Sequence, residues 1–78
     1  MPHINVKLLK GRDKAQLEEL TAAMALAMQK VLGCDDIHIS LSMEEYTPQE
    51  WQTVFSQEIH EKSATLVKAP GYDPKSLL

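Results

Sequence analysis

The feature that most constrains this 78-residue chain is the order of the hydrophobic patterns in its first half. Apolar residues alternate over residues 3–9, recur at helical spacing over about 13–32, and alternate again over 37–43. A helix of that length spans roughly 28 Å, which is enough to return along the first strand. We therefore predict an α/β (α+β) fold built on a parallel β-α-β unit with a right-handed crossover.

The long helix carries its own start and stop signals. Asp13 is a suitable N-cap, and Gln16 three residues later completes a capping-box pattern. Gly33 stands where a left-handed cap would end the helix. We expect the apolar stripe between these residues to face the core.

A second helix is predicted after the second strand. Thr47 is a suitable N-cap, Pro48 suits the first turn, and Glu50 can reach back to the cap. We expect this helix to continue until residues 69–71, where a proline and a glycine stop it, and residues 72–78 to form a short tail. Its apolar side is predicted to consist of Trp51, Val54, Phe55, Ile59 and Leu66.

The short length predicts one domain over residues 1–78, and it also predicts an oligomer. A two-stranded sheet is barely stable in water and exposes two unpaired edges. We expect pairing between subunits to complete a sheet of at least four strands across a homodimer, and dimers could assemble further. The polar face of the second strand, with His38, Ser40 and Ser42, is then solvated or turned toward a site.

Composition argues against several classes of function. The net charge is −3 and the Lys and Arg residues do not cluster, so we expect no nucleic-acid partner. No apolar run approaches the roughly 20 residues that cross a bilayer, so we expect no membrane partner. Cys34 is the only cysteine, which predicts a reduced, cytoplasmic protein. One cysteine and scattered histidines make no metal-binding pattern.

Pro2 is the residue with the clearest chemical potential. If Met1 is removed, Pro2 becomes a secondary amine at the start of a strand. Chain-terminal amines titrate at about 7.7–8.0, and an apolar pocket lowers that value further. Such a base can take a proton from carbon next to a carbonyl and return it elsewhere.

Taken together, these residues resemble the 4-oxalocrotonate tautomerase family. The resemblance rests on Pro2 after Met1, an alternating strand, Gly11-Arg12 before a capped helix, and a second alternating strand. The second half resembles the bacterial PptA branch of that family. The residues that carry this second likeness are Pro48, Trp51, Gln52, Glu58, Ile59, Lys68, Ala69, Pro70, Gly71 and Tyr72.

The resemblance implies a cofactor-independent keto–enol tautomerase, an isomerase, with Pro2 as general base. Arg12 stands where the family carries a substrate-binding arginine, and Trp51 is the nearest counterpart of its site aromatic. His38 stands where hexameric members place a second arginine. With fewer cations, the expected substrate is a small 2-keto or enol monocarboxylic acid rather than a dicarboxylate. His38 is a candidate hydrogen-bond donor to that substrate.

Two alternatives remain open. Tautomerase-like folds also carry out hydration, dehalogenation and decarboxylation, in which a cationic terminal proline acts as an acid. The chain could instead be a non-catalytic dimeric module that binds a small molecule. Pro2 opens the first strand and Arg12 follows its far end, about 23 Å away along the chain. If both residues serve one substrate, an antiparallel strand from a neighbouring subunit must bring its own Arg12 beside Pro2.

Overall fold

The computed structural model describes all 78 residues and contains two compact units, residues 1–45 and 46–78. No helix in the chain is both long enough and apolar enough to cross a membrane. The expectation of one domain over residues 1–78 stays a prediction.

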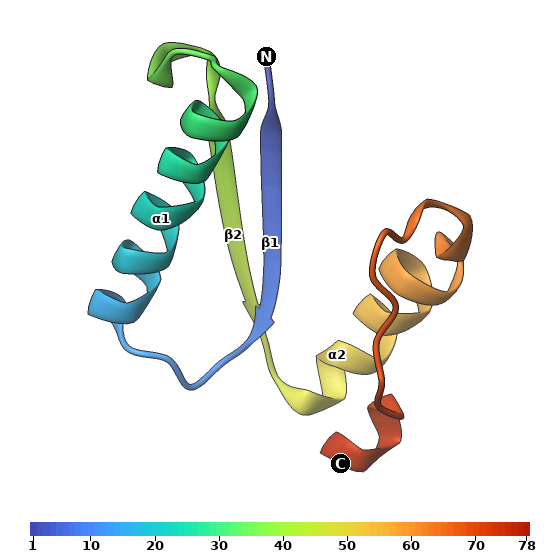
Figure 1. Cartoon of the computed structure of the whole chain (residues 1–78). Coiled ribbons are helices and arrows are strands. Elements are labelled where there is room, and N and C mark those ends of the chain that lie inside the picture. Colours follow the sequence, from blue (N-terminus) through green and yellow to red (C-terminus); the bar gives the residue numbers. More distant parts are fainter. The chain divides into compact units, whose positions relative to one another are not determined.

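The first unit is the predicted β-α-β unit. It contains β1 (His3–Leu9), α1 (Lys14–Leu32), the short 3₁₀ helix η1 (Asp36–His38) and β2 (Ser40–Tyr46), whose last residue begins the second unit. β1 and β2 form a two-stranded sheet, and their arrows in Figure 1 point the same way. The predicted parallel pairing is therefore confirmed.

The predicted helix ends of α1 are confirmed. Asp13 accepts a hydrogen bond from the backbone N–H of Gln16, at 2.8 Å, and the Gln16 side chain accepts one from the Asp13 N–H, at 3.3 Å. Gly33 adopts the left-handed conformation, with φ of 68°, and donates to the Gln29 carbonyl. These contacts satisfy backbone groups that a helix end otherwise leaves without partners.

The predicted start of the second strand at residue 37 is wrong. Ile37 and His38 lie in η1, and β2 begins only at Ser40. The register explains the difference, because side chains paired across the sheet are 37 residues apart, beginning with His3 and Ser40. Residues 37–39 would lie opposite positions where β1 has not yet begun. Ile37, which the alternating pattern placed in the strand, is 85% exposed.

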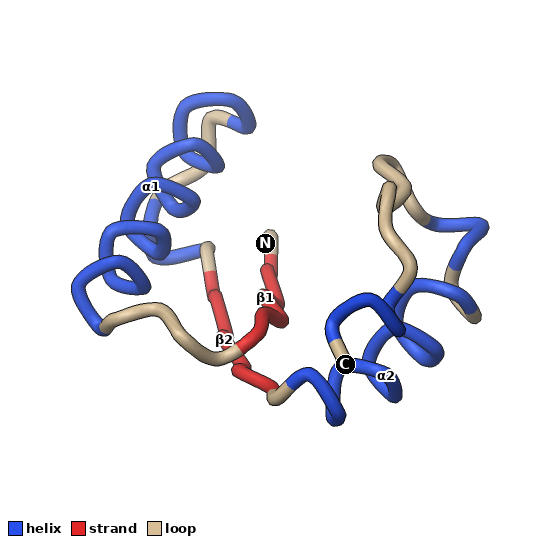
Figure 2. The backbone as a smooth tube through the Cα atoms, turned by 90° about the horizontal axis from the view of Figure 1, so that it is seen from below, coloured by secondary structure: helices blue, strands red, loops and turns tan.

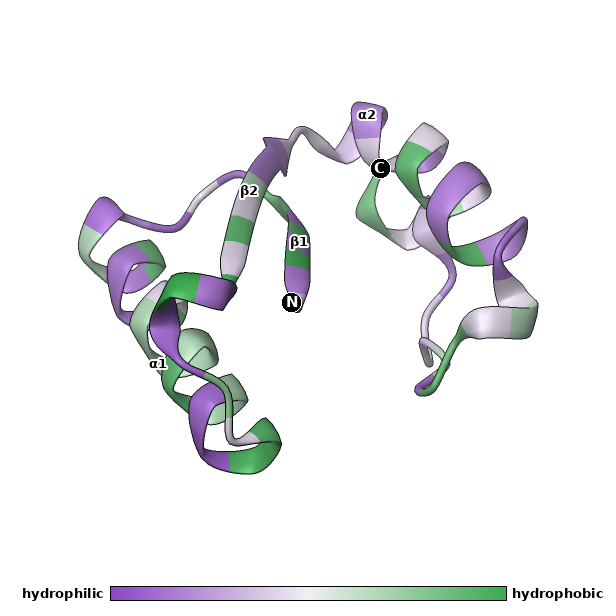
Figure 3. Cartoon of the chain, turned by 90° about the horizontal axis from the view of Figure 1, so that it is seen from above, coloured by the Kyte–Doolittle hydropathy of each residue, from purple (hydrophilic) through white to green (hydrophobic).

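The first unit has two layers, with α1 on one side of the sheet in both views of the backbone (Figures 1 and 2). Hydrophobic and hydrophilic residues alternate along both strands (Figure 3). The apolar strand residues Ile4, Val6, Leu41 and Met43 are only half-buried, and no residue of α1 is fully buried. The single chain therefore leaves much of the apolar surface of this unit incompletely covered.

The second unit is built around aromatic side chains on and near α2 (Pro48–Val54). Thr47 and Glu50 form the predicted capping box. Trp51 and Val54 are the two buried residues of the chain. The Trp51 ring meets Tyr46 edge-to-face at 6.2 Å between ring centroids, an arrangement that aromatic pairs favour.

The second helix ends earlier than predicted. After α2 the chain continues as a π-helix, η2 (Phe55–His60), and then as the 3₁₀ helix η3 (Ser63–Thr65). The backbone N–H and the hydroxyl of Thr65 both donate to the Lys62 carbonyl, each at 2.9 Å. In a continuing α-helix, the Lys62 carbonyl would accept a hydrogen bond from the backbone N–H of Leu66. Here Thr65 takes that place, and Leu66 is extended.

The C-terminal residues are folded onto α2. The 3₁₀ helix η4 (Pro74–Leu77) contacts α2, and the side-chain amide of Gln52 donates to the Pro74 carbonyl at 2.7 Å. The Trp51 indole N–H donates to the Tyr72 hydroxyl at 2.9 Å. The residues expected to form a tail thus complete the packing of the second unit.

Candidate active site

Pro2 lies immediately before β1 and is partly exposed. Its carbonyl accepts a hydrogen bond from the backbone N–H of Ser40 at 3.2 Å. This bond fixes Pro2 beside the first residue of β2 without using the proline nitrogen. Met1, which precedes it, is almost fully exposed.

Arg12 lies at the other end of β1, in the turn that leads to α1 (Figure 1). Gly11 adopts φ of 127° in this turn, a conformation that residues with a side chain rarely adopt. The Arg12 guanidinium is exposed and donates to the Leu9 carbonyl at 3.0 Å. Within one chain, the structure therefore places Pro2 and Arg12 at opposite ends of the strand.

His38 lies at the same end of the sheet as Pro2. It is the last residue of η1, two positions before the Ser40 that bonds to Pro2. Its ring is exposed and is not part of the strand face on which the sequence pattern placed it. The role of His38 in substrate binding stays a prediction.

Trp51 belongs to the second unit and is 9% exposed. Its ring packs on Tyr46 and its N–H is bonded to Tyr72. Phe55 meets the Tyr72 ring edge-to-face at 5.6 Å between centroids. These contacts give Trp51 a packing role within its unit, and its predicted contact with substrate stays a prediction.

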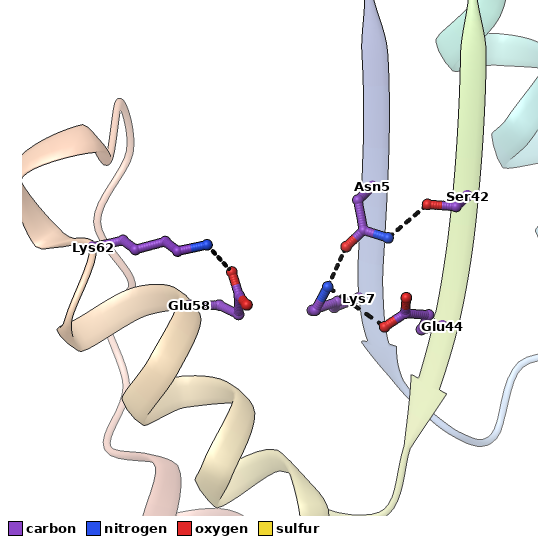
Figure 4. Close-up of polar contacts among 6 residues, drawn as sticks. All are labelled: Asn5, Lys7, Ser42, Glu44, Glu58 and Lys62. Atoms are coloured by element: carbon purple, nitrogen blue, oxygen red, sulfur yellow. Dashed lines mark hydrogen bonds and ion pairs between the residues drawn. The ribbon is translucent and has the colours of Figure 1, made fainter.

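A row of polar contacts crosses one face of the sheet and was missed by sequence reasoning. His3 Nδ1 and Ser40 Oγ are 2.6 Å apart, and Asn5 Nδ2 donates to Ser42 Oγ at 2.7 Å. Lys7 Nζ donates to Asn5 Oδ1 and lies 3.5 Å from Glu44 Oε2 (Figure 4). Both strands were predicted to alternate, but their register was not predicted, and the register decides which side chains lie opposite each other. The sequence pattern placed His38 on this polar face, but in the structure His38 lies in η1, outside the strand, and Glu44 belongs to the face.

Other polar contacts do not add a second candidate site. Glu58 and Lys62 form an ion pair at 2.6 Å one turn apart in the second unit (Figure 4). No group of three or more His, Cys, Asp or Glu side chains is placed to hold a metal ion. The candidate site is therefore the region around Pro2, which precedes β1 and is bonded to Ser40.

The family profile described as "Tautomerase enzyme" matches residues 2–55 of this chain. The chain belongs to the tautomerase family. The match begins at Pro2 and covers both strands and both α-helices. Membership supports a tautomerase-type, isomerase activity.

Individual tautomerases extend the likeness beyond the profile. A "Probable tautomerase" of Xylella fastidiosa (strain 9a5c) is 38% identical over 73 residues, covering 92% of this chain and 89% of the relative. Tautomerase PptA of Escherichia coli (strain SMS-3-5 / SECEC) is 33% identical over 73 residues, covering 92% and 97%. These matches confirm the predicted resemblance to the 4-oxalocrotonate tautomerase family and its PptA branch.

The fold agrees with a solved tautomerase structure. The crystal structure of TomN, described as a 4-oxalocrotonate tautomerase homologue of the tomaymycin biosynthetic pathway, superimposes with a TM-score of 0.62. It is 32% identical to this chain, and the alignment covers 64% of this chain and 77% of TomN. The predicted α+β tautomerase fold is confirmed.

Proposed function

We propose that this tautomerase interconverts the keto and enol forms of a small monocarboxylic acid, with Pro2 as general base after removal of Met1. The observation that carries the proposal is the position of Pro2, the first residue matched by the family profile. Its carbonyl is anchored to Ser40, and this contact leaves the nitrogen available for chemistry.

The proposed reaction needs only one proton carrier. The neutral Pro2 nitrogen takes the proton from the enol oxygen, and a proton is delivered to the neighbouring carbon. The enol C=C and O–H thereby become C–H and C=O. The carbonyl itself delocalises the developing negative charge, so the proposal includes no cofactor. A base whose pKa lies near the working pH is best suited to such a transfer.

Arg12 is proposed to bind the substrate carboxylate, because its planar guanidinium can donate two parallel hydrogen bonds. It is exposed and makes one hydrogen bond, to a backbone carbonyl. His38, exposed near Pro2, is the proposed donor to a substrate oxygen, and Trp51 is proposed to supply an apolar wall. One fixed cation favours a monocarboxylate over a dicarboxylate. The lone, unpaired Cys34 is consistent with the proposed cytoplasmic location.

We further propose that the site forms between two subunits of a homodimer. Seven strand steps from Pro2 to Leu9, the end of β1, span roughly 23 Å, and Arg12 follows in the turn beyond that end. An arginine side chain cannot bridge this gap. An antiparallel β1 from a partner would bring the partner's arginine beside Pro2. Such pairing would also satisfy an open sheet edge.

The surface of α1 supports this assembly. A shallow hollow on one flank of the helix presents mostly apolar surface and is lined by Lys14, Leu17, Glu18, Thr21, Ala22 and Ala25. Val31, elsewhere on the helix, is 83% exposed. The apolar arc of α1 is therefore wider than the two strands beside it cover. A wider sheet made by two subunits would cover more of it.

We expect the protein to sediment as a dimer or a larger oligomer at micromolar concentration, with no folded monomer on dilution. The reason is that the isolated chain buries too little apolar surface in its first unit to offset the entropy of folding. Analytical ultracentrifugation combined with circular dichroism over a dilution series measures both properties. A stable, folded monomer would contradict the proposed assembly.

The proposed function is tested by the pH dependence of ketonisation by Met1-trimmed protein. We expect turnover of at least one enol monocarboxylate, with kcat/KM falling as pH drops and the Pro2 amine becomes protonated. The opposite dependence, with activity lost as the amine becomes neutral, would instead indicate a hydratase, dehalogenase or decarboxylase that uses Pro2 as an acid. Saturable binding without turnover would indicate a binding module.

A further inference from the structure

Ser40 contacts both His3, the first residue of β1, and Pro2, which precedes it. Its backbone N–H donates to the Pro2 carbonyl at 3.2 Å, and its hydroxyl lies 2.6 Å from Nδ1 of His3. One residue of β2 thus contacts Pro2 through the backbone and His3, the first residue of β1, through a side chain. We call this arrangement the Ser40 clamp.

The start of β1 is a place where a chain would otherwise be mobile. Strand ends fray, and terminal residues are poorly ordered unless something ties them down. Once Met1 is removed, the Pro2 nitrogen is a secondary amine and would be the reacting base, so it cannot also tie the residue to the sheet through a ladder hydrogen bond. Its position therefore depends on its carbonyl and on the residue that follows it.

We infer that the Ser40 clamp is a positioning device for the Pro2 nitrogen, and that Ser40 and His3 are positioning residues of the reaction. This inference rests on the proposed function of Pro2. The two contacts involve the Pro2 carbonyl and the His3 side chain and not the Pro2 nitrogen. Both contacts can therefore remain after Met1 is removed, and they leave the nitrogen accessible. Misplacement of a reacting group by about 1 Å can cost on the order of 10²-fold in rate.

The same sheet face provides a matched control. Asn5 and Ser42 form the next polar contact along the strands, at 2.7 Å, between a side-chain amide and a serine hydroxyl. This pair resembles the His3–Ser40 pair in chemistry and in cross-strand spacing, but it lies two residues further from Pro2. Replacing either serine should weaken the sheet to a similar extent, whereas only replacement of Ser40 should disturb the position of Pro2.

We expect Ser40→Ala to lower kcat about three- to tenfold, with KM changing less than twofold. This range corresponds to about 0.6–1.4 kcal/mol, the net value of one hydrogen bond. His3→Phe should lower kcat by a similar factor. The double variant should be no slower than either single variant, because both changes remove the same contact. Ser40→Thr, which keeps the hydroxyl, and Ser42→Ala should both stay within twofold of wild type.

Amide hydrogen exchange supplies a readout that does not depend on activity. In Ser40→Ala and in His3→Phe, the protection of the residue 40 amide should fall, because its bond to the Pro2 carbonyl opens more often. In Ser42→Ala this protection should be unchanged. If wild type ketonises no enol acid, the proposed function fails. In that case, amide hydrogen exchange at residue 40 still tests whether the Ser40 clamp holds Pro2 in place. Equal kcat values for Ser40→Ala, His3→Phe and Ser42→Ala, or unchanged protection at residue 40, would overturn the inference.

Discussion

Replacing Pro2 by alanine in Met1-trimmed protein is expected to lower kcat/KM for ketonisation by about 10²–10⁴-fold, the usual contribution of a general acid or base. The variant loses the secondary amine and the ring that limits its motion. The Pro2 carbonyl bond to Ser40 can still form, so the fold should be preserved. Initial rates under first-order conditions measure the effect.

A second proline provides the control for this substitution. Pro70 is half-buried in the other unit and lies outside helices and strands. Pro70→Ala removes the same ring atoms and should keep kcat/KM within twofold of wild type. A similar loss of kcat/KM in Pro2→Ala and Pro70→Ala would indicate that the effect comes from reduced stability and not from removal of the base.

The second large effect is the recovery of activity when two inactive proteins are mixed. Arg12→Ala is expected to lower kcat/KM by at least tenfold, since it removes a charge-assisted contact to the carboxylate. If Pro2 meets the partner's arginine, a mixed dimer of Pro2→Ala and Arg12→Ala contains one intact site. With free subunit exchange, half of the dimers are mixed, so about a quarter of wild-type activity should return.

The double variant Pro2→Ala/Arg12→Ala is the control for complementation. Mixed with either single variant, it leaves no site with both residues, so no activity should return. Native mass spectrometry establishes that subunits have exchanged. Exchange without recovery of activity would show that the two residues do not meet across a dimer.

Much of the fold was predictable because its signals are local. The capping boxes at Asp13 and Thr47 and the left-handed Gly33 depend on residues within a few positions of each other. Alternation and helical spacing likewise predicted β1 and α1 with little error. Such features follow from backbone geometry before any long-range contact forms.

The errors concern features that depend on distant residues. The start of β2 is set by where β1 begins, 37 residues earlier, and this register cannot be read from Ile37 or His38 alone. The folded C-terminus depends on Trp51 and Tyr72, which are 21 residues apart. Hydrophobic periodicity does not carry information of this kind.

The candidate site was predictable only in part. The separation of Pro2 and Arg12 follows from strand length, and the structure places them at opposite ends of β1 (Figure 1). The contact between His3 and Ser40 was missed, because each residue was assigned separately to a strand surface. Aligning the two alternating patterns with the correct register would have paired them.

The central claim is that the free Pro2 nitrogen is the base, and the most direct test compares this nitrogen as an amine with the same nitrogen as an amide. Protein with Met1 fully removed and protein that keeps Met1 are compared in ketonisation of the enol form of a small 2-keto monocarboxylic acid, with each form identified by intact mass. An amide nitrogen at Pro2 cannot act as a base, so the rate should rise in proportion to the trimmed fraction, and the untrimmed form should be at least 10²-fold slower. Equal rates for the two forms would contradict the account.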